Sequence, residues 1–314
     1  MRFYIKILTV LLIVMLLFSC ASQRQDMRFT KDTDDIVLSN KGLKRIPRSI
    51  KKCKNLKFLD LEHNQIKHIP RFIAKMDSLR SLDLNYNHLK LTKYDIKHAA
   101  KVKKLSIGAN EIEELPENIG ILTCTNLNLG KNKLKDLPES FKDLTQIKHL
   151  IFYENEFESV PEEIEALDSL EHLDFYKNHI HEIPEFIGNL EDLRYLYLSY
   201  NEIEAIPDTM RNLKSLKYFY IHNNQLKKLP DWVSDMDSIE RLGVGFNKLI
   251  DLPDLSRLQT LVDFNCEENL LDIFPWELLT LPNIQLIVVR NNVFMLTEEE
   301  QEILKQNKRV VIVF

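Results

Sequence analysis

The sequence lacks the short motifs that mark common catalytic and metal sites. It contains no glycine-rich phosphate loop, no HExxH or GxSxG motif, no calcium-binding loop and no CxxC pair. Neighbouring carboxylates carry no information, because 47 of the 314 residues are acidic. We therefore expect a protein that is not an enzyme and that binds neither a cofactor nor a metal ion.

Cysteine is scarce, which excludes a disulfide framework. Only four cysteines occur in the chain. Cys53, Cys124 and Cys266 stand far apart at apolar positions, so we expect buried free thiols that pack as small hydrophobic groups.

A strong charge of one sign is also absent. A net charge of −5 provides no basic footprint for nucleic acid, and we expect no nucleic-acid partner. The average conceals a polarity along the chain. Residues 27–104 carry 20 basic and 8 acidic residues, whereas residues 105–209 carry 7 basic and 23 acidic ones. The charge that a partner would meet therefore changes from one segment to the next.

An apolar run near the N-terminus predicts an export signal. Arg2 and Lys6 precede an unbroken apolar stretch from Ile7 to Phe18. Its 12 residues match the core of a signal peptide. They fall short of the roughly 20 residues that a membrane-spanning helix needs. A short uncleaved anchor remains an alternative.

The end of this run, Leu17-Phe18-Ser19-Cys20, resembles a bacterial lipobox. The resemblance implies that residues 1–19 are a lipoprotein signal peptide, that Cys20 carries the lipid, and that residues 20–31 are a tether. Two acyl chains are enough for firm membrane attachment. A plain secretory peptide with an incidental cysteine is the alternative.

The remaining chain repeats one pattern. From Ile36 onward it reads LxxLxLxxNxL, followed in most copies by xx(I/L)PxxI, with a period of 22 or 23 residues. Lys41 takes the first asparagine position, and ten of the eleven prolines stand at one fixed offset after that position. The other eleven copies keep the asparagine: Asn64, Asn87, Asn110, Asn132, Asn155, Asn178, Asn201, Asn224, Asn247, Asn269 and Asn292.

Each part of the repeat has a physical reason. Alternate residues of the LxLxx stretch face opposite sides of a short strand, so Leu59 and Leu61 point to a core while Asp60 points to solvent. The asparagine amide can satisfy backbone groups where the chain leaves the strand. The fixed proline favours an extended or tight segment over a long helix. Because one repeat cannot bury its own apolar face, the repeats must stack.

This pattern resembles the leucine-rich-repeat superfamily in its 23-residue form with the LPxxI signature, over about nine tenths of the chain. Together with the lipobox, it is similar to a bacterial leucine-rich-repeat lipoprotein. The resemblance implies an α/β solenoid over residues 32–296. This would be a right-handed horseshoe of about 12 repeats, with a concave parallel β-sheet and a thin, mostly irregular convex side.

Two segments depart from the repeat. After Asn87, LTKYDIKHAAKVKKL replaces the proline segment and reads as helical. Near the end, Thr297 and Glu300 form a capping-box pattern that predicts a helix to about Gln306, followed by RVVIVF. Residues 297–314 are therefore predicted to be a C-terminal cap made of a helix and a last strand.

The predicted concave face carries the candidate binding site. Residues six, four, two and one before each asparagine should point into the concavity. Seven of the ten tyrosines fall there within four consecutive repeats: Tyr153, Tyr176, Tyr195, Tyr197, Tyr200, Tyr218 and Tyr220. The other candidates in these columns are His149, His172, Asp174, His222 and Phe246. Gly108 and Gly130 on one flank, and Gly243 and Gly245 on the other, predict that the aromatic patch stands above bare backbone on both sides.

Tyrosine is enriched at protein interfaces, which favours a non-catalytic protein–protein interaction module anchored to a membrane. The export signal and lipobox predict that it is lipid-anchored to the bacterial cell envelope, at the outer membrane or cell surface. Carbohydrate binding by the same tyrosines, with Asp174 or Asn128 bonding hydroxyls, is an alternative partner class. A structural role is another, in which neighbouring tyrosines only support one another. If the N-terminus does not direct export, a cytoplasmic signalling scaffold remains possible.

His149 and His172 share one column, and we expect them to be surface residues rather than metal ligands.

Overall fold

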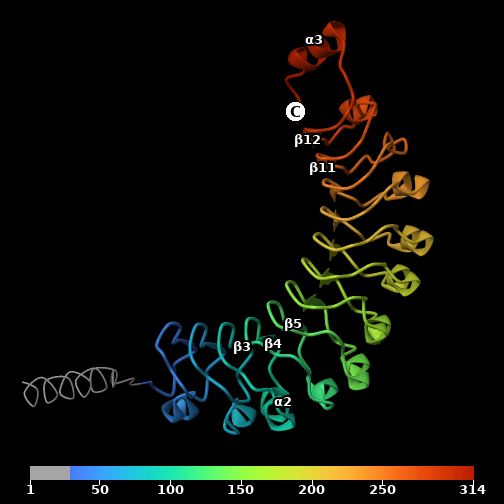
Figure 1. Ribbon diagram of the computed structural model, residues 1–314. Coiled ribbons are helices and arrows are strands. Elements are labelled where there is room, and N and C mark those ends of the chain that lie inside the picture. The colour runs from blue at the N-terminus through green and yellow to red at the C-terminus, as the bar shows by residue number, and fades with distance from the viewer. Residues whose placement is uncertain (1–28) are drawn as a thin grey trace, which may run out of the picture.

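The computed structural model describes residues 29–314, which form one curved solenoid (Figure 1). Thirteen three-residue strands pair in parallel and in chain order to make a single sheet. They are β1 (Asp35–Val37), β2 (Phe58–Asp60), β3 (Ser81–Asp83), β4 (Lys104–Ser106), β5 (Asn126–Asn128), β6 (His149–Ile151), β7 (His172–Asp174), β8 (Tyr195–Tyr197), β9 (Tyr218–Tyr220), β10 (Arg241–Gly243), β11 (Asp263–Asn265), β12 (Leu286–Val288) and β13 (Val311–Val313). The sheet lines the inner side of the arc, so the predicted horseshoe with a concave parallel sheet is confirmed.

The register of the sheet aligns equivalent residues of successive repeats. Leu59 pairs with Leu82 and Leu82 with Leu105, so the buried middle residue of each strand stacks on the next. The leucines, isoleucines and phenylalanines of all the repeats thereby form one continuous core. Each repeat buries its apolar face against its neighbours, as expected for a solenoid.

The convex side consists of short 3-10 helices in place of long α-helices (Figure 1). Within residues 29–314 these are η1 (Arg48–Lys52), η2 (Ile73–Lys75), η3 (Ile119–Ile121), η4 (Glu139–Asp143), η5 (Glu162–Ala166), η6 (Glu185–Asn189), η7 (Asp208–Asn212), η8 (Asp231–Asp235) and η9 (Trp276–Thr280). Most of them begin directly after the repeat proline. Pro184, with φ −70°, is an example, and its carbonyl accepts a hydrogen bond from the N–H of Ile187 at 3.1 Å.

Two α-helices occur where the repeat pattern is interrupted. Helix α2 (Lys93–Ala99) replaces the convex 3-10 turn after Asn87, and a capping box between Thr92 and Asp95 begins it. Helix α3 (Glu298–Gln306) begins with a capping box between Thr297 and Glu300 and leads into β13. In both cases a threonine oxygen accepts a hydrogen bond from an N–H that the helix leaves unpaired.

The repeat asparagines bind adjacent repeats together. The amide of Asn178 donates to the carbonyls of Phe175 in its own repeat and Phe152 in the preceding one, both at 3.1 Å. Its carbonyl oxygen accepts from the N–H of Phe157 at 3.2 Å. Each asparagine therefore bonds backwards along the solenoid. Lys41 occupies the position of the first described repeat, which has no earlier repeat within residues 29–314 to bond to.

One feature of the backbone was not predicted from the sequence. The residue before each asparagine position adopts the left-handed conformation, with φ between 52° and 59°. This column holds Asn40, His63, Tyr86, Ala109, Lys131, Glu154, Lys177, Tyr200, Asn223, Phe246, Glu268 and Asn291. An aromatic side chain there costs backbone energy on the order of 1 kcal/mol relative to glycine. This turn directs the side chain toward solvent, and Tyr200 is 48% and Phe246 39% exposed.

Cys53, Cys124 and Cys266 are buried and unpaired. Burial raises the pKa of the Cys124 thiol to about 12, so this thiol is protonated at neutral pH. The predicted signal peptide, Cys20 and most of the predicted tether lie outside the described residues. Among residues 29–314, no helix has both the length and the apolar character required to cross a bilayer.

Candidate binding site on the concave face

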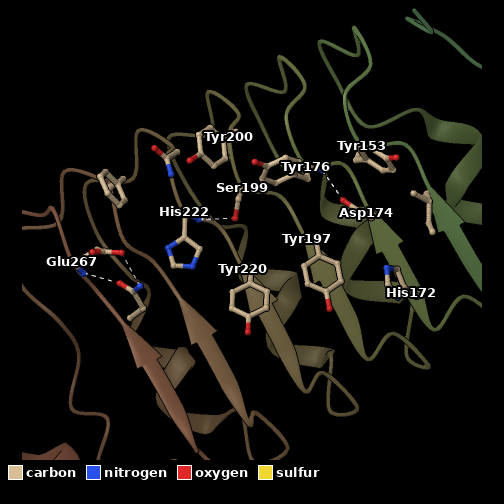
Figure 2. Close-up of a pocket in the computed structure, with 14 residues that line it drawn as sticks. Tyr153, His172, Asp174, Tyr176, Tyr197, Ser199, Tyr200, Tyr220, His222 and Glu267 are labelled. Carbon is tan, nitrogen blue, oxygen red and sulfur yellow. Dashed lines mark hydrogen bonds between the residues drawn. The ribbon is translucent and has the colours of Figure 1, made fainter. Parts of the chain in front are cut away.

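A hollow of about 650 Å³ lies on the concave face over strands β6 to β11 (Figure 2). Its lining residues are Ile151, Tyr153, His172, Asp174, Tyr176, Tyr197, Ser199, Tyr200, Tyr220, His222, Asn223, Phe246, Asn265 and Glu267. Nine of the twelve candidate residues are in this set. The other three are His149, Tyr195 and Tyr218, which lie outside the hollow in the column at the start of each strand.

The sheet register places the central tyrosines side by side. Asp174, Tyr197 and Tyr220 end strands β7, β8 and β9 and are directly paired. The rings of Tyr197 and Tyr220 stack with centroids 5.5 Å apart and an interplanar angle of 18°. The His222 ring continues this stack, 5.7 Å from Tyr220. The parallel pairing of the strands thereby places the rings side by side as a continuous aromatic floor.

Two further tyrosines form the rim of the hollow. Tyr176 and Tyr200 meet edge to face with centroids 5.1 Å apart, and they come from the turns that follow β7 and β8. Figure 2 shows both rings along one side of the hollow, with Tyr197 and Tyr220 across from them. No dashed line reaches a tyrosine hydroxyl in this view, so these hydroxyls make no hydrogen bond among the residues drawn.

The first strand column forms a separate row of rings beside the hollow. His149 and His172 lie 5.7 Å apart, His172 and Tyr195 5.8 Å, and Tyr195 and Tyr218 5.0 Å between ring centroids. The Arg241 guanidinium lies 5.0 Å above the Tyr218 ring. His172 is the only member of this row that also reaches the hollow.

The histidine pair does not belong to a metal-binding cluster. Within residues 29–314, no three His, Cys, Asp or Glu side chains converge to hold a metal ion. Burial, together with the neighbouring His149, lowers the pKa of His172 to about 4. The His172 imidazole is therefore neutral at physiological pH and adds no positive charge to the hollow.

Asp174 is the carboxylate of the hollow on its β7 side. Its Oδ1 accepts a hydrogen bond from the N–H of Tyr176 at 2.8 Å. Burial raises the pKa of this carboxyl to about 6, although the Tyr176 N–H opposes the shift. Within the described chain the carboxylate forms no ion pair, and no cation contributes to its pKa. A charge that is half-buried and uncompensated costs free energy in the folded protein.

His222 and Ser199 form a second polar group in the hollow, away from Asp174 (Figure 2). The N–H of His222 donates to the Ser199 hydroxyl at 3.0 Å, and the N–H of Gly245 donates to His222 Nδ1 at 3.1 Å. Burial lowers the pKa of His222, although nearby Glu267 opposes the shift. With Nδ1 as an acceptor, the neutral ring carries its proton on Nε2.

Glu267 is compensated, unlike Asp174. It accepts hydrogen bonds from the Asn265 amide at 3.0 Å and from the Arg290 guanidinium. Burial raises the pKa of Glu267, but these donors and the charge of Arg290 outweigh it, so the net pKa is lowered. Glu267 thus remains ionised and neutralised by its own partner.

The sequence reading missed five lining residues: Ile151, Ser199, Asn223, Asn265 and Glu267. All of them stand four, two or one residue before a repeat asparagine, in the columns already assigned to the concave face. The signal was therefore present. These side chains carry no ring, so the tyrosine pattern alone does not single them out.

The flanking glycines are covered, which corrects the expectation of bare backbone on both sides. A Cβ on Gly130 would lie 2.3 Å from the Tyr153 ring, and one on Gly243 would lie 2.1 Å from His222 Nε2. The outermost rings of the site therefore lie flat on these glycines. Glycine permits this close approach because it has no Cβ. The glycines therefore extend the aromatic surface, because the rings at its edges can pack directly on their backbone.

Comparison with known proteins identifies the repeat. A model of the leucine-rich repeat region matches residues 172–312, and a leucine rich repeat model matches residues 34–89. Among the curated proteins, no match is found.

Solved structures share the fold at low sequence identity. An internalin of Listeria monocytogenes is similar with a TM-score of 0.72 and 22% identity, over 90% of this chain and 87% of the internalin. A leucine-rich-repeat protein of Leptospira interrogans gives a TM-score of 0.55 and 23% identity, over 90% of this chain and 96% of its own. The third, from an octameric complex of latrophilin 3, Unc5D and the leucine-rich-repeat protein FLRT2, gives a TM-score of 0.72 and 21% identity, over 90% of both chains. At these identities the likeness concerns the fold alone. The family matches therefore identify residues 34–89 and 172–312 as leucine-rich repeats, and the stacked parallel strands of residues 29–314 form a leucine-rich-repeat solenoid.

Proposed function

We propose that this protein is a non-catalytic module that binds a protein partner through its tyrosine-rich concave face. The observation that carries the proposal is the hollow over β6 to β11, where five tyrosines come together on adjacent repeats. Tyrosine combines a large apolar surface with a hydroxyl and loses little conformational entropy on binding. The hydroxyl of Tyr220 interacts with the Arg241 guanidinium. The other tyrosine hydroxyls drawn in Figure 2 have no partner among the lining residues, so a ligand can use them.

The family context supports a protein as the ligand. One structural relative comes from a complex of latrophilin 3, Unc5D and FLRT2, in which FLRT2 contributes the leucine-rich repeats. An open concave sheet also fits a convex protein surface better than it encloses a small molecule. Adjacent ring pairs contribute to stability as well, but stability alone does not require the tyrosines to gather in four neighbouring repeats.

The proposal is tested by replacing Tyr176, Tyr197 and Tyr220 together with alanine. We expect the triple variant to bind the partner captured by the wild type at least tenfold more weakly, because these rings supply the centre of the contact surface. The partner is captured from the native membrane fraction, identified by mass spectrometry and then titrated in purified form against both proteins.

Tyr94→Ala is the matched control, because Tyr94 is 61% exposed on helix α2, outside the hollow. Circular dichroism must first show that each variant is folded. Unchanged affinity of a folded triple variant would contradict the proposal and leave the tyrosines with a structural role. If a glycan array is bound by the wild type and not by the triple variant, while no protein is captured, the ligand is a carbohydrate.

We also propose that the module is exported and lipid-anchored to a bacterial cell envelope through Cys20, at the outer membrane or cell surface. The support is the apolar run that ends in Leu17-Phe18-Ser19-Cys20. Metabolic labelling with palmitate is expected to mark the wild type and to be lost completely in Cys20→Ser. Persistent labelling of that variant would show that the lipid is not carried by Cys20, and an unlabelled wild type retained in the cytoplasm would favour a cytoplasmic scaffold instead.

A further inference from the structure

The hollow has an unbalanced charge. Its lining includes two carboxylates, Asp174 and Glu267, and neither lysine nor arginine. Glu267 is neutralised by Arg290, whereas Asp174 has no cation beside it in residues 29–314. The neighbouring His172 does not compensate, since its imidazole is neutral at physiological pH. The hollow therefore carries, at Asp174, one negative charge that the described chain leaves unpaired.

The fold does not require a carboxylate at this position. Asn128 and Asn265 occupy the same strand column as Asp174, and each accepts the same hydrogen bond from the N–H two residues later, at 2.9 Å. An asparagine thus provides the turn without a charge. Oδ2 of Asp174, the oxygen not used by Tyr176, is available to a ligand.

The rings around Asp174 suit a cation. Figure 2 shows Tyr153 and Tyr176 on one side of the carboxylate, with Tyr197 on the next strand. Burial raises the pKa of Tyr197 to about 12, with the charge of Asp174 adding to the effect, so this ring stays neutral and keeps its electron-rich face. Aromatic faces attract organic cations, and the attraction grows where water is excluded.

We propose that Asp174, Tyr153, Tyr176 and Tyr197 form an anchor site for an arginine side chain that the protein partner inserts into the hollow. The inference rests on the proposed function and specifies the chemistry of its ligand. Guanidinium is favoured over ammonium because it is planar, stacks on tyrosine rings and loses less hydration on burial. Its N–H groups would donate to Asp174, giving the charge-assisted hydrogen bonds that the carboxylate lacks.

The experiment compares two small peptides on the full-length protein in detergent. N-acetyl-Gly-Arg-Gly-amide carries the guanidinium, and N-acetyl-Gly-citrulline-Gly-amide replaces it with an uncharged group of the same shape. Binding is followed by NMR of ¹³C-labelled tyrosine rings. We expect the arginine peptide to cause saturable shifts of the Tyr153, Tyr176 and Tyr197 signals, and the citrulline peptide to bind at least tenfold more weakly.

Asp174→Asn is the test variant, because asparagine keeps the hydrogen bond from Tyr176 while it removes the charge. It should bind the arginine peptide at least tenfold more weakly than the wild type. Asp83→Asn is the matched control, since Asp83 accepts the same bond from Asn85 at 2.9 Å in the same column, outside the hollow. This variant should bind as the wild type does.

Two results would overturn the arginine anchor. They are equal binding of the arginine and citrulline peptides, and equal binding of the arginine peptide by wild type and Asp174→Asn. The absence of any saturable shift counts as equal binding. If the tyrosine triple variant still loses its partner in that case, the proposed function stands and only the anchor fails. If the triple variant keeps its partner, the proposed function itself fails, whatever the peptides do.

Discussion

Replacing Asn178 with alanine is expected to lower the free energy of unfolding by about 3–5 kcal/mol. Asn178 is only 6% exposed, and its amide satisfies the carbonyls of Phe152 and Phe175 and the N–H of Phe157. Alanine leaves the N–H of Phe157 without a partner, and the carbonyls of Phe152 and Phe175 each lose one of two donors, since Asn155 and Asn201 still bond to them. The buried unsatisfied N–H costs about 1–3 kcal/mol, and each lost hydrogen bond adds about 0.5–1.5 kcal/mol. Urea denaturation followed by circular dichroism measures the change.

Asn212→Ala provides the control for this experiment. Asn212 is exposed at the end of η7 on the convex side, so its replacement should change stability by less than about 0.5 kcal/mol. A loss below 1 kcal/mol for Asn178→Ala would show that water or a rearranged turn replaces the side chain. The repeat asparagines would then mark the turn without holding it together.

The repeat fixes most of the fold because its period is strict. One residue of slippage would move a core residue such as Leu173 to the solvent face. The position of Asn178 therefore determines which neighbours are buried, which face the concavity and where the convex turn begins. The prolines likewise predict tight convex segments, although their geometry as 3-10 helices is visible only in the structure.

The left-handed turn before each asparagine could not be predicted from residue type. Asparagine and glycine favour this conformation, yet Tyr200 and Phe246 adopt it too. Here the backbone bonds to the adjacent repeat determine the conformation: the N–H of Tyr200 donates to the carbonyl of His222 at 2.9 Å. Tertiary bonding thus overrides a local preference on the order of 1 kcal/mol.

The candidate site, too, could be predicted from the sequence only in part. Column positions predict which residues face the concavity, because strand alternation is a local rule. Contacts across repeats are different, since they depend on side-chain reach. The pairing of Glu267 with Arg290 and the cover of Tyr153 over Gly130 are of this kind. For that reason the sequence indicated Asp174 but not Glu267, and only the structure distinguishes the compensated Glu267 from the uncompensated Asp174.

The uncompensated carboxylate of Asp174 leads to a second prediction, an effect on the free energy of unfolding. At pH 7.5, Asp174→Asn is expected to raise the free energy of unfolding by about 2–3 kcal/mol. The folded protein raises the pKa of Asp174 from 3.8 to about 6. Above pH 6 the group is ionised in both states, and the folded state bears the full cost of the buried charge. Asparagine removes this cost while it keeps the bond to Tyr176, as Asn128 and Asn265 do in their own repeats.

The pH dependence separates this cause from a simple packing effect. Between pH 6 and pH 3.8 the folded wild type takes up the proton that the unfolded chain still releases, so the wild type gains stability as pH falls. The advantage of Asp174→Asn should therefore shrink from pH 7.5 to pH 5 and vanish near pH 4. His172 stays neutral over most of this range, since its pKa is about 4. Urea denaturation at four pH values gives the comparison. Asp60→Asn is the control, because Asp60 accepts the same hydrogen bond from the N–H of Glu62 at 2.9 Å in the same strand column. A gain that persists unchanged at pH 4 would mean that packing, not charge, is responsible. A gain that fades would show that the solenoid gives up stability to keep a charge in its binding hollow, as expected if that charge serves a ligand.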